Sequence, residues 1–313
     1  DPKSEVLTGH ELAARLSYLL WSSMPDEELA VYADDGSLVE SDVLVGQVSR
    51  MLTDPKASAL ADNFASQWLY IRDILNVFPD PWVFPGFDEA LRDAMRLEML
   101  QFFTTFVNED RSMLELLSAK ETFVNQRLAD HYGLDMNIPE GEWIRVSLEG
   151  TERRGLLTQA GLLTVLSTPF RTSIVRRGKW VLEQILCEGP PPPPPGVEAD
   201  LGVEEGEEPK TLREMMEQHA ADPLCVACHQ LMDPIGFGLE NFDGIGQWRE
   251  EDSGFPIDAS GTLPGDLAFD GPEELIELVT TDDRLPGCIV EKTFIYAMGR
   301  GIKDEDEPYI EAI

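Results

Sequence analysis

The stretch LTGHELAARLSYLLW, residues 7–21, indicates how this chain folds. Thr8, followed three residues later by Glu11, matches a capping box, in which two side chains satisfy the free amide groups at the start of a helix. Four leucines then recur at helical spacing, at Leu12, Leu16, Leu19 and Leu20. The stretch therefore predicts an amphipathic helix with one apolar face.

Similar patterns continue through the first 135 or so residues. Further helices are expected at 41–54, 58–75, 90–107 and 123–133. Their aromatic side chains, including Trp68, Phe102 and Phe103, recur at helical spacing and suit a core. Residues 142–150, EWIRVSLEG, alternate like a short strand.

The second half begins with two more helical patterns, near 155–166 and 174–187. Six consecutive prolines, 190–195, and the acidic run after them predict an extended, solvated linker, with a recognition peptide as the alternative. Helices are expected again at 211–222, 272–282 and 288–301, with turns and short strands at 261–271. The sequence thus predicts a mainly α fold, in which a multi-helix N-terminal domain is joined to a smaller, loop-rich helical C-terminal region with short strands.

Four segments follow from these patterns. They are a helical N-terminal domain (1–150), a basic helical segment (151–189), a Pro-rich and acidic linker (190–209) and a C-terminal region (210–313). A chain of 313 residues is long enough for two or three compact units.

The charge balance excludes several classes of partner. Lys and Arg number 24 against 59 Asp and Glu, which gives a formal net charge of −35. Such a surface repels nucleic acid and anionic membranes, so a charged partner is expected to be cationic. No run of ~18 apolar residues occurs, so no membrane span is expected.

The motif with the clearest chemistry lies in ADPLCVACHQLMDPIGF, residues 221–237. Cys225, Cys228 and His229 match the C-x-x-C-H pattern of covalent c-type haem attachment. The two sulfur atoms can form thioethers with one porphyrin edge, and the adjacent imidazole can bind the iron through one nitrogen. Its other nitrogen is then expected to donate to a carbonyl or carboxylate. The motif predicts one covalent haem c in residues 210–313.

Three alternatives compete with haem. A zinc site needs four ligands in a tetrahedron, and the remaining Cys and His residues are scattered. A thioredoxin-like pair normally follows a strand, whereas these flanks are helical and turn-like. A chance Cys-Cys-His in a core is the third alternative.

The other two cysteines, Cys187 and Cys288, have two possible states. Covalent haem belongs to exported proteins, in which a leftover pair forms a disulfide. Two free buried thiols are the equally weighted alternative.

The sixth iron ligand is open in the sequence. His219, His131, His10 and Met298 can supply it, whereas Met232 lies on the same side of the ring as His229. His219 ends the helix that precedes the motif, where a bend at Pro223 can fold it over the iron. An open sixth position would instead allow peroxide or small-ligand chemistry.

An exception to the acidic composition lies at 153–182, which contains no Asp or Glu but six basic residues. One hypothesis places Arg171, Arg176 or Arg177 at the haem propionates, because a guanidinium matches a carboxylate bidentately. The alternative is that these arginines pair with surrounding acids and hold domains together.

Several segments carry a resemblance that covers nearly the whole chain. CVACHQLMDPIGFGLENFDGIGQWR (225–249) resembles a signature of exported bacterial proteins built from domains of unknown function 1592, 1588 and 1585. The residue ranges 11–29, 161–186, 296–301 and 306–313 resemble parts of these domains. The resemblance implies a periplasmic, extracellular or cell-surface protein with a cytochrome c-like haem.

Two departures from the family pattern matter. Relatives commonly carry further domains upstream, so an electron partner or a larger extracytoplasmic assembly is expected. Relatives often have Leu where this chain has Met298, and an equivalent of His219 recurs, which favours His219 as the ligand.

The preferred function is one-electron transfer to an unidentified redox partner protein, with Phe237, Phe242 and Trp248 as walls of the haem pocket. A haem peroxidase-like enzyme is the first alternative, so whether the chain is an enzyme stays open. A structural or surface-assembly protein with an accessory haem is the second. The sequence fixes neither the oligomeric state nor any substrate.

Overall fold

The computed structural model describes residues 7–191, 211–220 and 226–313, without the side chains of residues 219 and 220. The chain is mainly helical, as predicted, with three two-stranded antiparallel sheets among these residues. Within the same residues, no helix combines the length and the apolar character needed to cross a membrane. Most of the predicted linker 190–209, the bend at Pro223 and Cys225 lie outside the described residues.

The chain divides into two compact units that are not continuous in sequence. Unit 1 comprises Asp1–Leu69, Leu100–Met113 and Ile289–Ile313, and unit 2 comprises Tyr70–Met99 and Leu114–Cys288. This grouping differs from a linear division at residues 150, 189 and 209, because two long helices each contribute residues to both units.

Unit 1 begins with the helix that the capping box predicts. Its elements are α1 (Gly9–Trp21), α2 (Glu27–Asp34), α3 (Ser41–Thr53), the short turns η1 (Ser37–Val39) and η2 (Pro55–Ala57), η3 (Leu60–Ala65), α4 (Ser66–Trp68) and α13 (Glu307–Glu311). Both hydrogen bonds of the capping box form between Thr8 and Glu11. The buried Trp21 donates its indole N–H to the carbonyl of Met51 over 2.9 Å and so joins α1 to α3.

The segment 58–75, predicted as one helix, is divided. It forms the π-helical turn η3, the short α4 and then the 3₁₀ turn η4 (Ile71–Asn76) of unit 2. α4 ends at Trp68, and Tyr70, with a φ of 60°, separates it from η4. Trp68, Phe102 and Phe103 are buried, as expected of core residues.

Two long helices supply residues to both units. They are α5 (Glu89–Asn108) and α12 (Arg284–Met298), which ends before Gly299 at a φ of 63°. Gly299 thus acts as the C-cap that the sequence predicts.

The first part of unit 2 has a small sheet and short helices. Its elements are η5 (Met113–Leu116), β1 (Glu121–Val124), α6 (Gln126–His131), β2 (Ile144–Ser147), η6 (Leu156–Thr158) and α7 (Ala160–Val165). β2 is the predicted strand, and it pairs antiparallel with β1 from Glu121 opposite Ser147 to Val124 opposite Ile144. The prediction of a helix from residue 123 is wrong at its start, because Phe123 and Val124 pair in this sheet and α6 begins only at Gln126.

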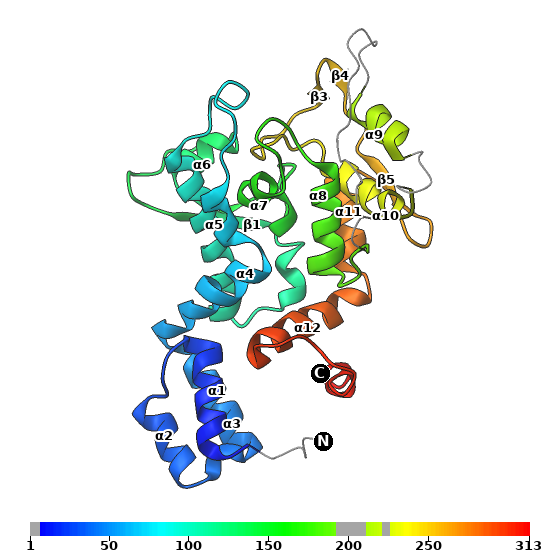
Figure 1. Cartoon of the computed structure of the whole chain (residues 1–313). Coiled ribbons are helices and arrows are strands. Elements are labelled where there is room, and N and C mark those ends of the chain that lie inside the picture. Colours follow the sequence, from blue (N-terminus) through cyan, green and yellow to red (C-terminus); the bar gives the residue numbers. More distant parts are fainter. Residues whose placement is uncertain (1–6, 192–210, 221–225) are drawn as a thin grey trace. The chain divides into compact units, whose positions relative to one another are not determined.

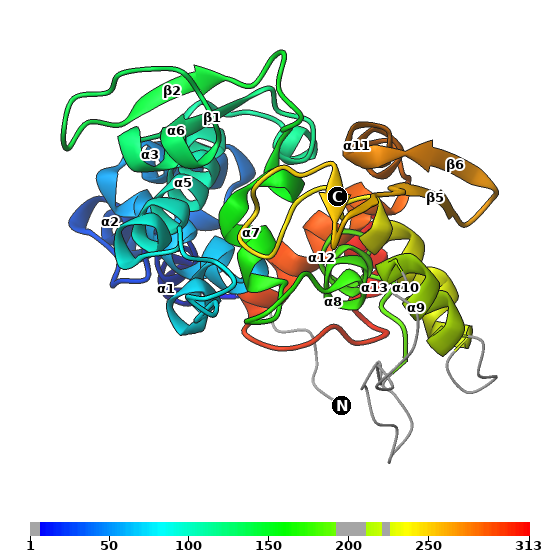
Figure 2. The ribbon, with the colours of Figure 1, turned by 90° about the horizontal axis from the view of Figure 1, so that it is seen from above.

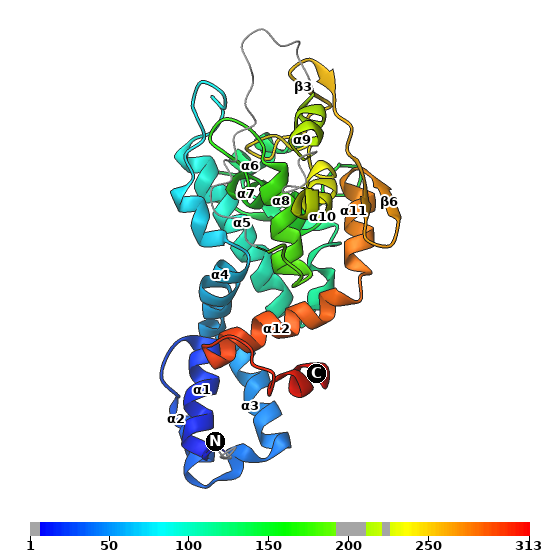
Figure 3. The ribbon, with the colours of Figure 1, turned by 45° about the vertical axis from the view of Figure 1, so that its right-hand side comes forward.

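The rest of unit 2 surrounds the motif. Its elements are α8 (Ile174–Trp180), η7 (Val181–Ile185), α9 (Leu212–Ala220), α10 (Val226–Phe237), β3 (Glu251–Asp252), β4 (Phe255–Pro256), β5 (Ser260–Leu263), β6 (Leu267–Asp270) and α11 (Gly271–Thr280). α10 packs along α8 (Figures 1 and 3). The β5–β6 hairpin, predicted as turns and short strands, contacts α10 through β5 and α11 through β6 (Figure 2).

Candidate functional site

The C-x-x-C-H motif lies at the start of α10, inside unit 2. Cys225 lies outside the described residues, and Cys228 and His229 occupy the first turn of the helix. Cys228 is a free, half-buried cysteine whose sulfur lies 3.9 Å from the carbonyl oxygen of Pro191. The described part of the motif is therefore helical, and the Cys228 thiol is partly exposed.

His229 is oriented by a carboxylate four residues further along the same helix. Its Nδ1 lies 3.0 Å and 3.1 Å from the two carboxylate oxygens of Asp233, so this nitrogen carries the proton and donates it. Asp233 is buried, with 9% of its side chain exposed. The sequence predicts such an acceptor without naming it, and the signal that finds it is the i, i+4 spacing, which places both side chains on one helix face.

The imidazole of His229 borders a groove of about 650 Å³. α10 lines it with His229 and Asp233, α9 with Arg213, and β6 with Phe269. This volume falls within the range of about 300–1,000 Å³ that is usual for cofactor and ligand sites. A planar group held by the motif would therefore meet both polar and aromatic walls here.

One cation is fixed at the edge of this groove. The guanidinium carbon of Arg213 lies 3.9 Å from the ring centre of Phe237, and Nη2 donates to the carbonyl of Ser260 over 2.5 Å. Its Nε lies 3.2 Å from the carboxylate of Asp258. Arg213 thus ties α9 to α10 and to the β5–β6 hairpin, and the sequence gives no local signal for it.

The opposite side of α10 is pressed against α8. A Cβ added to Gly178 would lie 1.9 Å from the carbonyl oxygen of Met232, and one added to Gly236 would lie 2.2 Å from the carbonyl oxygen of Ile174. Only glycine allows the two backbones to approach this closely at both positions. The pair of glycines therefore fixes α10, and the motif on it, against α8.

Arg177 anchors the loop that follows α10. Its side chain is fully buried, and it donates to the carbonyls of Leu239 and Phe242 over 2.6 Å and of Asp243 over 2.7 Å. Burial lowers the pKa of Arg177 to about 10. These contacts occupy the guanidinium with backbone acceptors, and a role for Arg177 at a propionate stays a prediction.

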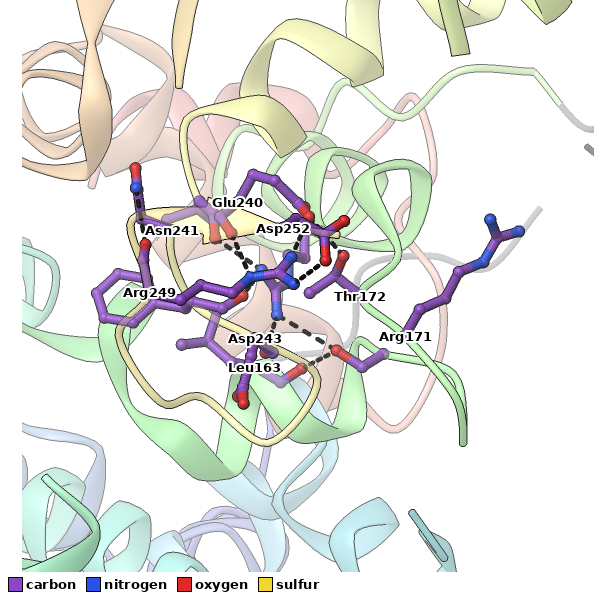
Figure 4. A network of polar contacts seen from close by, with 12 residues as sticks. Leu163, Arg171, Thr172, Glu240, Asn241, Asp243, Arg249 and Asp252 are labelled. Carbon is purple, nitrogen blue, oxygen red and sulfur yellow. Dashed lines mark hydrogen bonds and ion pairs between the residues drawn. The ribbon is translucent and has the colours of Figure 1, made fainter. Parts of the chain in front are cut away.

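A network of side chains closes around the same loop (Figure 4). Arg249 pairs with Glu240 and, over 2.6 Å, with Asp252, while Thr172 donates to Glu240 over 2.7 Å. Burial raises the pKa of Glu240. Among the labelled residues, Arg171 extends its guanidinium away from this network.

Arg176, the other arginine predicted to bind a propionate, is exposed. Its Nη1 donates to the carbonyl of Ser167 over 2.7 Å. Arg176 is absent from the residues that line the groove beside His229. Its role at a propionate stays a prediction.

The three aromatic residues predicted as pocket walls take different positions. Phe237 lines the groove beside His229. Phe242 is fully buried and packs edge-on against Trp248, with ring centres 5.2 Å apart. Trp248 lines another cavity, of about 630 Å³, together with Arg153. The structure therefore brings only Phe237 to the motif.

The other candidate iron ligands are also dispersed. The buried His131 of α6 donates its Nε2–H to the carbonyl of Ile245 over 2.8 Å, and burial lowers its pKa to about 4. Met298 ends α12 within unit 1, and His10, also in unit 1, lies 3.3 Å from Asp34. His219 belongs to α9, and its side chain lies outside the description.

The structure pairs the two remaining cysteines. Cys187 and Cys288 form a disulfide across 101 residues, with their Cα atoms 5.3 Å apart. Of the two states left open by the sequence, this is the bridged one. The bridge joins the segment after η7 to α12 and leaves Cys225 and Cys228 for other chemistry.

A second buried polar cluster lies in unit 2 around Glu98 on α5. Its carboxylate accepts hydrogen bonds of 2.7 Å from Thr122 and from Tyr132. Burial raises the pKa of Glu98 to about 7 despite these bonds. Arg153 stacks 3.8 Å above the Tyr132 ring and donates to the carbonyls of Thr158 and Gly246. The cluster joins α5, α6 and the loop after α10, and no sequence motif points to it.

Comparisons with known proteins match three successive parts of the chain. Three family models, each described as a protein of unknown function, match in order: DUF1592 at residues 7–134, DUF1588 at 153–252 and DUF1585 at 266–313. The chain therefore has the three-domain architecture that the sequence resembles. No curated protein matches it, and no solved structure does. The C-x-x-C-H motif and the groove both involve the segment matched by DUF1588.

Proposed function

We propose that this chain is an exported mono-haem protein that carries single electrons to and from a redox partner protein. One haem would be attached by thioethers to Cys225 and Cys228, with His229 as an axial ligand. Such a haem would supply a reversible one-electron couple, whose potential depends on the axial ligands and on burial.

The observation that carries this proposal is the pairing of His229 with Asp233 beside a groove. A metal-bound imidazole needs a partner that fixes its ring and its tautomer, and the buried carboxylate supplies one. The half-buried thiol of Cys228 lies on the same helical turn as His229. The residues present thus fit a haem attached at this helix.

The disulfide supports the exported location. Disulfides persist in oxidising compartments and are rare in the cytosol. Since Cys187 and Cys288 are joined to each other, neither competes with the motif cysteines. The acidic composition favours a cationic partner protein, because opposite charges steer association.

The test is expression in a host that matures c-type cytochromes. The intact mass is expected to exceed the amino-acid mass by one haem, and the pyridine haemochrome spectrum is expected to report two thioethers. Cys228→Ala should leave one thioether, and His229→Ala should alter the ligation of the iron. A colourless chain with only its amino-acid mass would overturn the proposal.

A matched control separates the motif from general effects of substitution. Tyr18→Ala changes an exposed aromatic residue of unit 1 that is no candidate ligand, and it should leave the spectrum as it is. The ferric spectrum also tests His219, whose replacement by Ala should remove a low-spin signal if it supplies the sixth ligand. A high-spin wild-type spectrum would favour the peroxidase-like alternative.

A further inference from the structure

The partner of His229 is a carboxylate, and this choice has an electronic consequence. A backbone carbonyl would hold the ring equally well, because it also accepts the Nδ1–H. We propose that Asp233 is a positioning residue that makes His229 a strong electron donor to the iron, and that it thereby keeps the reduction potential low. This inference rests on the haem attachment proposed above.

The geometry places the Asp233 carboxylate against this histidine. Both carboxylate oxygens lie within 3.1 Å of Nδ1, and only 9% of the Asp233 side chain is exposed. A hydrogen bond to an ionised acceptor is stronger than one to a neutral acceptor, and partial burial strengthens it further. The proton of Nδ1 is therefore drawn toward the carboxylate, and the ring gains electron density.

The backbone holds this pair in place. Asp233 follows Met232, whose carbonyl oxygen is packed against Gly178 of α8. His229 and Asp233 both lie on α10, so this close contact with α8 holds the backbone that carries the pair. The carboxylate is thus a charge held beside the imidazole that would bind the iron.

A fixed negative charge favours the more positive state of the iron. Ferric haem carries one more positive charge than ferrous haem, so the carboxylate stabilises it more through Coulomb attraction. The more basic imidazole acts in the same direction, because a stronger donor also stabilises the ferric state. Both effects lower the reduction potential.

Asp233→Asn separates charge from orientation. The amide has nearly the same shape as the carboxylate and keeps one oxygen that accepts the Nδ1–H, but it carries no charge. We expect the Asn variant to retain its haem, its circular dichroism and its ligation, and to show an upward shift of the midpoint potential. The conservative Asp233→Glu restores the charge and should bring the potential back toward that of the wild type.

Asp258→Asn is the matched control. It also removes a carboxylate near the groove, one that contacts Arg213. Its potential should shift less than that of Asp233→Asn. An equal shift in both variants would mean that general surface charge, and not the His229 pair, sets the potential, which would overturn the inference.

The remaining outcomes distinguish the two proposals. A wild-type chain that carries no haem would remove the proposed function and this inference together. A haem-loaded Asp233→Asn variant with an unchanged potential would remove the inference alone. If Asp233→Asn loses its haem, the Asp233→Glu variant distinguishes the outcomes. A Glu variant that keeps its haem with a potential close to that of the wild type supports the charge effect. A Glu variant that also loses its haem contradicts it.

Discussion

The two sides of α10 pack in different ways. Toward α8 the contact is made by backbone, with Gly178 and Gly236 in place of larger side chains. On the other side, His229 and Asp233 border a groove of about 650 Å³. The side that faces α8, the closed side, leaves no room for a ligand. The side that carries His229 and Asp233, the groove side, has polar and aromatic walls.

The difference shows how a short helix can hold the side chain of His229 in a fixed direction. Close backbone contact and the buried Arg177 fix the helix and the loop after it. The groove side can then hold a group without having to stabilise the fold itself. Substitutions on the closed side are therefore expected to affect folding, and those on the groove side to affect the binding of the proposed haem.

The largest effect is expected from the disulfide that anchors the segment after η7. Replacing Cys187 and Cys288 together by Ser opens a loop of 101 residues, which costs ~4.7 kcal/mol in the loop-entropy description. Urea unfolding without reductant measures the loss. Cys228→Ser in haem-free chain is the control and should change stability little. Equal stability of the double variant and the wild type would contradict the prediction.

The next effect tests whether Arg177 holds the closed side. Arg177→Met leaves the carbonyls of Leu239, Phe242 and Asp243 without this donor in a buried place, and the free energy of unfolding should fall by about 4 kcal/mol. The neighbouring Arg176→Met removes an exposed arginine and should cost no more than about 1 kcal/mol. Similar losses for both variants would show that the loop does not depend on Arg177.

A third effect concerns how the stability of unit 2 depends on pH. The pKa of Glu98 is raised to about 7 in the folded chain from 4.5, so its contribution to stability is fully present below pH 4.5 and is lost as the pH rises through 7. Glu98→Gln removes this dependence. Relative to the wild type, the free energy of unfolding of the variant should rise by about 3 kcal/mol when the pH is raised from 4 to 8.

Thermal unfolding of both chains across this range measures the difference. Glu89→Gln, at the start of the same helix and with an exposed side chain, is the control and should leave the pH dependence as it is. Parallel profiles of stability against pH for Glu98→Gln and the wild type would contradict a raised pKa at Glu98.

The smallest effect compares the two sides of α10 directly. Gly236→Ala places a Cβ against the carbonyl oxygen of Ile174 and should cost about 2 kcal/mol of stability. On the groove side, Gln230→Ala should stay within about 0.5 kcal/mol, because Gln230 is exposed.

Gly46 of α3 supplies a matched glycine control. An added Cβ there meets nothing within 4 Å, so Gly46→Ala should stabilise by roughly 0.5–1 kcal/mol, as expected for a glycine replaced inside a helix. Stabilisation by Gly236→Ala as well would mean that the two helices can separate without cost.

The sequence by itself determined the local features. The capping box at Thr8 and Glu11, the glycine that ends α12 and the mainly helical fold follow from interactions between residues close in the chain, and the strand at Ile144–Ser147 is visible as a local alternation. Such interactions have a fixed spacing, so they can be read from one sequence. The C-x-x-C-H motif is local in the same sense, and the haem that it predicts stays a proposal.

The tertiary structure decided which distant residues meet. From the sequence, the basic residues between 153 and 182 are expected to bind a propionate or to pair with acids. In the structure, Arg177 instead donates to backbone carbonyls more than 60 residues away, which no local pattern predicts. Likewise, the partial helix prediction at residue 123 failed because Phe123 and Val124 pair with a strand 20 residues later. The disulfide, the Glu98 cluster and the glycine contact between α8 and α10 depend on long-range packing, and no local spacing in the chain encodes them.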